Sequence, residues 1–360
     1  MATVTVVGGG YGGVAAAKQL DKVADVVLVE PRDTFVHTVA ALRALVDPQW
    51  TDRIFLPYDG LLTAGRVVRD RALAADADSV TLASGEVLGT DYLVLASGSS
   101  YPFPAKIDVF DSAAAKAKIR ATHDALTRAE SVLLLGAGPA GLELAGEIKA
   151  AWPEKAVTVV DPAEDILAGA YPDEFRTELR DQLAALGVEA LTGAGLAEHP
   201  PSEPGEAKSF TVRTTQGREV TADIWFRCYG VSPVSDYLAG PLASARRPNG
   251  QVEVTDELRL PGQERVFALG DLTAIAEPKM AKAAGEHAVV VADNIATLIA
   301  GGTELRTYRP GPPGISLPLG PSGGASYSAE HGIFGPEQTS QLKGADLRIA
   351  LYRELFGLPA

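Results

Sequence analysis

Residues 3–20 read TVTVVGGGYGGVAAAKQL, and residues 131–148 read SVLLLGAGPAGLELAGEI. Each stretch contains a short β-branched or leucine-rich run, the motif GxGxxG and an alanine-rich segment with helical character. A buried strand, a glycine loop and a helix in this order are the opening unit of a dinucleotide-binding fold. The sequence therefore predicts two such units in tandem.

The repeat continues beyond the glycine loops. Each copy has a second predicted strand that ends in an acidic residue, at Asp25–Glu30 and at Ala156–Asp161. Further along, residues 79–98 and 210–230 share one pattern, in which glycine, aspartate and glycine follow one another at spacings of 6 and 7 residues. Glycine turns in these stretches predict β-hairpins. The order predicts an α/β fold with two tandem Rossmann-like dinucleotide-binding domains, hairpin or meander insertions and a small C-terminal segment.

The composition argues against several classes of function. The 360 residues are 46% hydrophobic and 22% charged, with a formal charge of −14. This is typical of a globular enzyme and unfavourable for nucleic-acid binding. The single cysteine, Cys228, cannot form a dithiol–disulfide pair within the chain and is expected to pack as a small core residue. The five scattered histidines lack metal-ligand spacing, so no metal site is predicted.

Targeting signals are not expected either. The first residues, MATVTVVGGG, lack the basic region of a signal peptide, and residue 2 is Ala2 rather than the glycine that N-myristoylation requires. No apolar run is long enough to form a transmembrane segment. A cytoplasmic location is therefore predicted.

The glycines of the first loop have distinct expected roles. Gly8 allows the tight turn, Gly10 lets a pyrophosphate approach the backbone, and Gly13 lets helix and strand pack closely. The N-terminus of the following helix favours bound phosphate. Glu30 comes 22 residues after Gly8 at a strand end, where it would accept hydrogen bonds from a ribose.

The second loop repeats this arrangement with Gly136, Gly138 and Gly141. Asp161 stands at the strand end, 25 residues after Gly136. A carboxylate at this position repels a 2′-phosphate, and no arginine follows before Arg176. NADH is therefore expected in preference to NADPH.

Two dinucleotide sites in one chain suggest a flavin and a nicotinamide. The stretch VFALGDL (266–272) ends in Gly270 and Asp271, and in this architecture such an aspartate meets the ribityl or phosphate region of a flavin. Pro278 is favourable at the first turn of a helix predicted over Lys279–Ile299, whose N-terminus would face the N1–C2=O edge of the flavin. Non-covalent FAD is thus expected in the first copy.

The sequence resembles the two-dinucleotide-binding-domain flavoproteins. Within them it is similar to the apoptosis-inducing-factor-like group that includes the ferroptosis suppressor proteins, with type II NADH dehydrogenases as more distant relatives. The resemblance rests on the first glycine loop and on DTFVHTVAALRALV (33–46), YLVLASGSSYPFP (92–104), GAGPAGLELAGEIKAAWPEKAVTVVD (136–161) and FALGDL…PKMAKAAGEHAVVVADNI (267–295). The chain departs from the group in two ways. It lacks the myristoylated glycine of the membrane-tethered members, and it has Ala96-Ser97-Gly98 where Ala-Thr-Gly is usual.

The resemblance implies a domain organisation and an activity. Residues 1–112 and 232–300 would form the FAD-binding domain, residues 113–231 the NAD(P)H-binding domain, and residues 301–360 a C-terminal segment. A hydride would pass from NAD(P)H to FAD, and electrons from FAD to a quinone or another small acceptor. The matching motif positions add further expected cofactor contacts, at Arg43, Ala96, Gly98, Gly230 and Met280.

Comparison of the two copies identifies one chemically informative difference: Ala15 in the first helix corresponds to Glu143 in the second. In relatives the matching glutamate pairs with a lysine beside the flavin, and the Pro-Lys-Met block makes Lys279 the expected partner. A favourable helix-dipole position is the alternative explanation for Glu143. Quinone reduction needs protons, which Glu143, Lys279 or His37 would relay, although a lone histidine is more often structural. Glu147 is expected to be a surface or interdomain carboxylate.

The tail Leu342–Phe356 predicts a short helix with Leu347, Leu351 and Leu355 along one side. Such a helix would dock on the body of the protein or on the partner in a homodimer. The alternative is peripheral contact with a membrane surface, where the helix would guide a quinone. The acidic chain and the short stripe favour docking.

Three functional classes remain open from the sequence. The leading hypothesis is an FAD-dependent NADH:quinone-type oxidoreductase. A ferredoxin or rubredoxin reductase shares the two-domain plan but would be expected to carry a basic docking face, at odds with a charge of −14. An apoptosis-inducing-factor-like redox sensor would instead form a long-lived NADH complex and change its assembly.

Overall fold

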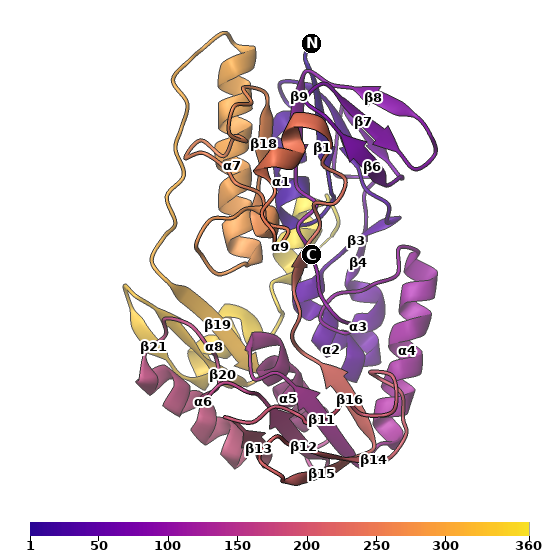
Figure 1. The fold of residues 1–360 in the computed structure, drawn as a ribbon, viewed down its shortest axis with the longest axis vertical. Coiled ribbons are helices and arrows are strands. Elements are labelled where there is room, and N and C mark those ends of the chain that lie inside the picture. The colour runs from indigo at the N-terminus through magenta and orange to yellow at the C-terminus, as the bar shows by residue number, and fades with distance from the viewer. Residues whose placement is uncertain (360) are drawn as a thin grey trace.

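The computed structural model describes residues 1–359. The first glycine loop follows a strand of a five-stranded parallel sheet, which lies at the top of Figure 1. In spatial order its strands are β18 (Val266–Ala268), β9 (Tyr92–Leu95), β1 (Thr3–Val7), β2 (Asp25–Val29) and β5 (Arg66–Val68). Helices α1 (Tyr11–Leu20) and α7 (Ala281–Ile299) cover one face. The other face packs against a β-meander.

The second glycine loop lies in a four-stranded parallel sheet in the lower half of Figure 1. Its spatial order is β13 (Val188–Leu191), β12 (Ala156–Val160), β11 (Ser131–Leu135) and β16 (Ile224–Arg227). Helices α4 (Ser112–Arg128), α5 (Pro139–Ala151) and α6 (Asp173–Ala185) cover one face, and a hairpin covers the other. The predicted α/β fold is confirmed, with two sheets of the same layering.

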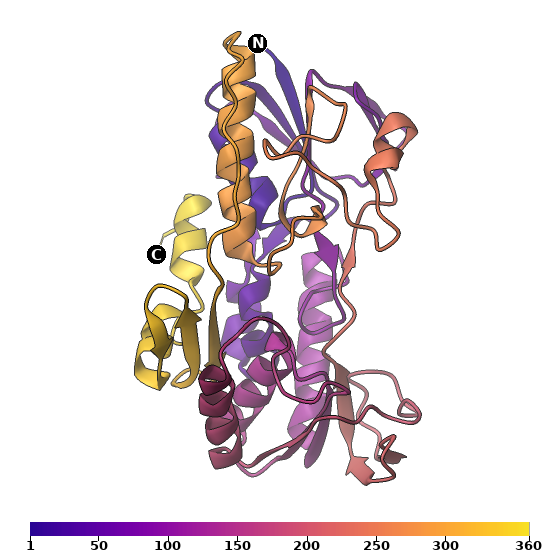
Figure 2. The same cartoon turned by 60° about the vertical axis from the view of Figure 1, so that its left-hand side comes forward.

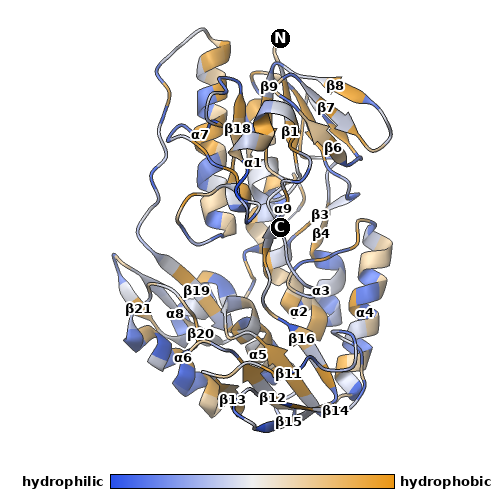
Figure 3. Ribbon diagram, in the orientation of Figure 1, coloured by the Kyte–Doolittle hydropathy of each residue, from blue (hydrophilic) through white to orange (hydrophobic). Residues whose placement is uncertain are grey.

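Sequence repetition also fixes the same strand register in both sheets. Strand β1 pairs with β2 from Thr3↔Asp25 to Val7↔Val29, and β11 pairs with β12 from Ser131↔Ala156 to Leu135↔Val160. Figure 3 shows apolar residues concentrated on β11 and β12. Continuous Val/Leu runs suit parallel strands because both of their faces are covered.

Both predicted hairpins are present on the outer faces of the sheets. The first is part of a meander of β6 (Ala72–Ala75), β7 (Ser79–Leu82) and β8 (Val87–Gly89), and the second joins β14 (Phe210–Arg213) to β15 (Glu219–Ala222). Gly85 and Gly217 have φ of +91° and +85° in the two turns. Glycine adopts this region without steric cost.

Short elements connect the two halves. Each half contains one of the two parallel sheets. Strands β10 (Ser99–Ser100) and β17 (Ser232–Pro233) form an antiparallel pair at the point where the chain passes between the two halves. The remaining elements of the first half are β3 (Thr34–Val36), η1 (Thr38–Ala40), α2 (Ala41–Val46), α3 (Pro48–Arg53), β4 (Phe55–Pro57), η2 (Gly240–Ala245) and η3 (Gly270–Leu272). Helix α2 packs against α5 of the second half.

After α7 an extended linker runs beside that helix (Figure 2) and leads to the C-terminal segment. Strands β19 (Gly314–Leu319), β20 (Gly323–Ser328) and β21 (Gly332–Phe334) form an antiparallel sheet, followed by α8 (Pro336–Thr339), η4 (Ser340–Gly344) and α9 (Ile349–Leu355). The sheet packs against α5 and α6, whereas α9 returns to the first half. The C-terminal segment therefore contacts both halves.

The prediction of a single helix over residues 342–356 is wrong. Leu347 and Arg348 have φ of +50° and +60°, and the chain turns there between η4 and α9. The carboxylate of Asp346 accepts a hydrogen bond from the backbone N–H of Arg348, which competes with helical hydrogen bonding. Among residues 1–359, no helix combines the length and the apolar character needed to cross a membrane.

Candidate functional site

The two glycine loops have the same geometry. A Cβ atom on Gly8 would lie 2.5 Å from the carbonyl oxygen of Ala96, and one on Gly136 would lie 2.8 Å from that of Cys228. Both glycines have positive φ, of +107° and +114°. The loop backbone thus passes directly over the neighbouring strand end, which leaves no room for a side chain.

The other glycines of the two loops are also equivalent. A Cβ on Gly13 or Gly141 would lie 1.8 or 1.9 Å from the carbonyl oxygen of the first glycine in its loop. A Cβ on Gly10 or Gly138 would have no atom within 4 Å. The middle glycine therefore borders open space, where a pyrophosphate could approach the backbone.

Each loop leads into a helix whose N-terminus suits an anion. In the described part of the chain, neither α1 nor α5 has a side-chain N-cap or an acidic residue in its first turn. The amide groups there are available to phosphate oxygens, and the helix dipole favours the negative charge. These features fit one dinucleotide pyrophosphate per loop.

An acidic residue supports each loop. Glu30 accepts a hydrogen bond from the N–H of Gly9 at 2.6 Å, and Asp161 accepts one from the N–H of Ala137 at 2.7 Å. Burial raises the pKa of Glu30, and the hydrogen bond from Gly9 opposes that shift. Both acids stand directly after the second strand of their sheet, at the edge where a ribose would be bound.

Three strand ends meet at the first loop. The parallel strands β1, β9 and β18 end at the same edge and are followed by the glycine loop, by Ala96–Gly98 and by Gly270–Asp271. Asp271 accepts hydrogen bonds from the Ser99 hydroxyl at 2.6 Å and from the Lys106 amino group at 3.3 Å. The structure thus brings most of the predicted flavin contacts to one edge, and Met280 is the N-cap residue of the adjacent helix α7.

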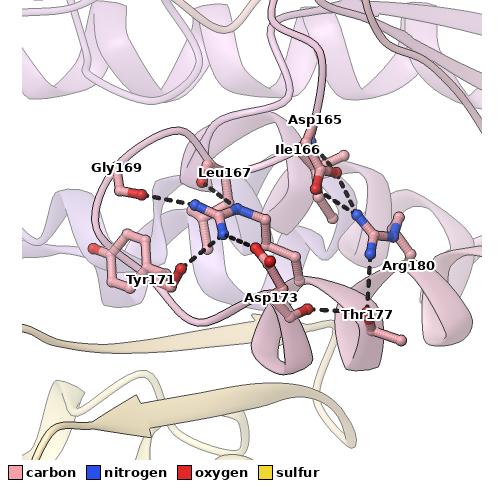
Figure 4. A network of polar contacts seen from close by, with 9 residues as sticks. Asp165, Ile166, Leu167, Gly169, Tyr171, Asp173, Thr177 and Arg180 are labelled. Atoms are coloured by element: carbon pink, nitrogen blue, oxygen red, sulfur yellow. Dashed lines mark hydrogen bonds and ion pairs between the residues drawn. The ribbon is translucent and has the colours of Figure 1, made fainter.

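The loop that follows Asp161 is held by two arginines of α6. Arg176 donates hydrogen bonds to three backbone carbonyl groups drawn in Figure 4, those of Leu167, Gly169 and Tyr171. Arg180 binds both carboxylate oxygens of Asp165 at 2.5 Å (Figure 4). Both guanidinium groups are therefore engaged with acceptors of the protein itself.

The predicted pairing of Glu143 with Lys279 is wrong. Glu143 accepts a hydrogen bond from the amino group of Lys343 at 2.6 Å, so its partner comes from the C-terminal segment. The Lys279 amino group instead binds the carbonyl oxygens of Thr273 and Ile275 at 2.9 and 2.8 Å. These bonds close the loop before α7, and α7 begins at Ala281 rather than at Lys279.

Arg43, an expected cofactor contact, is engaged with acceptors of the protein itself. Its guanidinium forms hydrogen bonds of 2.7 to 3.1 Å to both carboxylate oxygens of Glu147, and a further one of 3.3 Å to the carbonyl of Ala345. These contacts use most of the donors of the side chain. Arg43 therefore joins α2 to α5 and to the C-terminal segment, and Glu147 is a buried interdomain carboxylate.

His37 is fully buried, and both of its ring nitrogens have protein partners. Nε2 lies 2.8 Å from the carbonyl oxygen of Leu347, to which it donates, and Nδ1 lies 3.2 Å from the Tyr11 hydroxyl. Burial lowers the pKa of His37 to about 4. The ring also packs against Tyr352 of α9. This environment favours the structural alternative over a proton relay.

Two residues near the site make contacts that sequence patterns do not predict. In the sequence, Lys343 stands out only as a polar residue of the predicted tail helix. Its partner Glu143 is 200 residues away in the sequence, so no local pattern connects the two. His287 of α7 contacts the backbone of Gly270 at 3.0 Å. The motif GEHAVVVADNI contains His287 but does not reveal this contact, which depends on how α7 packs beside β18.

Two uncapped helices at matching glycine loops, each with a supporting acid, define a class of protein: two-domain α/β oxidoreductases that use FAD and a nicotinamide dinucleotide. Residues 2–288 match the family of pyridine nucleotide-disulphide oxidoreductases. The chain belongs to that family and is an FAD-dependent NAD(P)H oxidoreductase. Its single cysteine distinguishes it from a member that uses a dithiol pair of its own.

Relatives of known name agree with the predicted resemblance. The chain is 34% identical to ferroptosis suppressor protein 1 of Taeniopygia guttata, over 89% of this chain and 87% of that protein. It is 28% identical to apoptosis-inducing factor homolog B of Dictyostelium discoideum, over 97% and 95% of the two chains.

Solved structures share the fold. The sulfide:quinone oxidoreductase of Aquifex aeolicus superposes with a TM-score of 0.77 at 18% identity, covering 99% of this chain and 92% of that one. NDH2 of Plasmodium falciparum, solved with NADH, gives 0.75 at 13% identity, covering 99% and 94%.

Proposed function

We propose that this protein oxidises NADH and reduces a quinone-type acceptor through FAD. The observation that carries the proposal is the duplication of one cofactor-binding geometry in a chain with a single, buried cysteine. Burial raises the pKa of Cys228 to about 12, so its thiol is a poor nucleophile. Electrons would therefore leave the flavin directly for a small acceptor. The shared fold of the sulfide:quinone oxidoreductase of Aquifex aeolicus supports a quinone as this acceptor.

The residues around the two loops would bind and orient rather than react. FAD would supply the redox chemistry, and hydride transfer needs no protein base. At the first loop, Glu30 would hold a ribose and Asp271 the ribityl or phosphate region. At the second loop, Asp161 would hold the ribose of NADH. Gly230, which has φ of +98° after β16, would shape the backbone near the nicotinamide.

In this proposal the pair of Glu143 and Lys343 would supply protons. Both side chains are more than four-fifths buried, on the helix that begins at the second glycine loop and on the C-terminal segment. Lys279 is less suited because its amino group already binds two carbonyl oxygens. Burial lowers the pKa of Lys279, but its position supports a loop-closing role.

A preference for NADH over NADPH is the next part of the proposal. Asp161 would repel a 2′-phosphate, and Arg176 and Arg180 are engaged with the loop carbonyls and Asp165 (Figure 4). A 2′-phosphate would therefore meet a carboxylate without a free guanidinium beside it.

The C-terminal segment supports docking more than membrane contact. Leu347 is 2% exposed, and Phe356 is buried among aromatic residues of the first half, whereas Leu351 is 58% exposed. The three leucines therefore do not form one exposed stripe. Peripheral membrane binding through residues 342–356 would have to rely on a smaller apolar surface.

Anaerobic stopped-flow spectroscopy tests the proposal. The purified protein should carry a flavin spectrum that NADH bleaches rapidly and that a soluble quinone restores rapidly. Purification without flavin, despite supplementation with FAD, would refute the assignment of the first loop. A persistent long-wavelength band with slow reoxidation would favour a redox sensor, and fast reoxidation only by a ferredoxin would favour a ferredoxin reductase.

A further inference from the structure

The turn that carries Asp271 is held by a histidine of α7. The backbone N–H of Gly270 donates a hydrogen bond to Nδ1 of His287 at 3.0 Å. Only 1% of His287 is exposed. Gly270 has φ of +71° and is the first residue of η3, which follows β18 and packs against α7. Figure 1 shows β18 beside α7. A buried amide needs an acceptor, so this nitrogen satisfies a group that would otherwise be costly.

The protonation state of His287 follows from its partners. Because Nδ1 accepts from a backbone N–H, the ring proton of the neutral side chain is on Nε2. Nε2 lies 2.7 Å from Oε1 of Glu277, so the Nε2–H group donates a hydrogen bond to that carboxylate oxygen. Burial lowers the pKa of His287, and Glu277 opposes that shift. A neutral ring in this tautomer is the state that matches both contacts.

The same carboxylate connects the turn to the linker. Oε2 of Glu277 accepts a hydrogen bond from the Tyr308 hydroxyl at 2.7 Å, and the rings of Tyr308 and His287 meet edge to face at 4.3 Å. Tyr308 lies in the extended linker that runs beside α7 in Figure 2. Four groups thus form one chain of hydrogen bonds, from Tyr308 through Glu277 and His287 to the amide of Gly270.

We propose that His287 is a positioning residue for the flavin, which acts by fixing the Gly270–Asp271 turn, and that Tyr308 and Glu277 hold His287 in the required orientation. This inference rests on the proposed function, since the turn matters only if FAD is bound at the first loop. Asp271 touches the cofactor in that proposal, whereas His287 acts through the backbone. The linker to the C-terminal segment thereby becomes part of the support of the flavin site.

Three variants separate positioning from simple packing. His287→Leu removes the acceptor and keeps apolar volume. His287→Gln retains an acceptor and a donor at a spacing similar to that of Nδ1 and Nε2. Tyr308→Phe removes only the hydroxyl that orients Glu277. His123→Leu is the matched control, because His123 is also hydrogen-bonded to the backbone through Nδ1, in this case to the carbonyl oxygen of Leu45, but lies on α4 away from the turn.

The measurements are the dissociation constant of FAD, the midpoint potential of the bound flavin and the hydrogen-exchange rate of the Gly270 amide in the protein without flavin. His287→Leu should weaken FAD binding about tenfold or more, a change that corresponds to ~1.4 kcal/mol, shift the potential and speed exchange of that amide. His287→Gln should restore all three values most of the way. Tyr308→Phe should produce a smaller change in the same direction.

Two results would overturn the inference. One is a flavin affinity and potential in Tyr308→Phe and His287→Leu equal to those of the control, even if the proteins melt earlier. The other is failure of His287→Gln to rescue a defect seen in His287→Leu. If His287→Leu does not fold, the comparison of Tyr308→Phe with wild type still tests whether this chain of hydrogen bonds positions the flavin. A wild-type protein that binds no FAD would instead refute the proposed function.

Discussion

Arg43 of α2 and Glu147 of α5 form a bidentate ion pair between the two halves of the chain, with a shortest N–O distance of 2.7 Å. Both side chains are 4% exposed. Burial raises the pKa of Glu147, and the Arg43 guanidinium opposes that shift. Glu143 lies one helical turn before Glu147 and binds Lys343, so two ion pairs meet where α2, α5 and the C-terminal segment pack together.

Breaking the buried pair should be costly. Arg43→Met leaves the carboxylate of Glu147 buried without its partner, and we expect a loss of about 3–5 kcal/mol in the free energy of unfolding, measured with urea. The double variant Arg43→Met/Glu147→Leu should recover most of it. The control Arg213→Met disrupts the exposed pair with Glu219 and should cost less than about 1 kcal/mol. Equal costs for Arg43→Met and the control would contradict the prediction.

A double-mutant cycle tests the partner of Glu143. We expect Glu143→Gln and Lys343→Met to be coupled by about 1–3 kcal/mol in the free energy of unfolding, because the two side chains are in direct contact. Glu143→Gln and Lys279→Met should be additive within about 0.5 kcal/mol. The reverse pattern of coupling would restore the pairing that the family resemblance implied.

Asp161 should control the choice of nicotinamide dinucleotide. Asp161→Asn removes the charge that would repel a 2′-phosphate and retains one acceptor for the loop amides. The ratio of kcat/KM for NADPH to that for NADH should rise about tenfold, or ~1.4 kcal/mol. Glu189→Gln, an exposed position on the adjacent strand β13, should leave the ratio unchanged. An unchanged ratio in Asp161→Asn would show that Asp161 does not control this choice.

His37 should make stability depend on acid pH. Its folded-state pKa of about 4 is below the ordinary histidine value of 6.5, so the unfolded chain takes up the proton first. The contribution is complete above pH 6.5 and is lost as the pH falls towards 4, by about 1.4 kcal/mol per pH unit. Urea unfolding should show this loss in the wild type and less of it in His37→Gln. Equal pH dependence of the two proteins would contradict the assignment.

Protonation of His37 should also loosen the C-terminal segment. A proton on Nδ1 would remove the acceptor that the Tyr11 hydroxyl uses and place a charge beside the aromatic residues that hold α9. Hydrogen exchange in residues 345–358 should therefore accelerate at acid pH before global unfolding. Uniform exchange across the chain would show that the segment does not respond separately.

The sequence by itself determined the two glycine loops, the strands around them and the hairpins, because these depend on local patterns. Alternation of apolar runs, glycine turns and acidic strand ends repeats over short distances, and each copy carries the full signal. Glu30 and Asp161 could be placed for the same reason, since a strand of known direction fixes where its C-terminal acid lies.

Only the tertiary structure decided which distant side chains meet. Lys343 rather than Lys279 reaches Glu143, Arg43 faces Glu147, and His287 supports Gly270. These contacts depend on how α2, α5, α7 and the C-terminal segment pack, and on the break at Leu347 and Arg348. Packing of separate elements places side chains to within an ångström, whereas residue patterns specify only the face of each element.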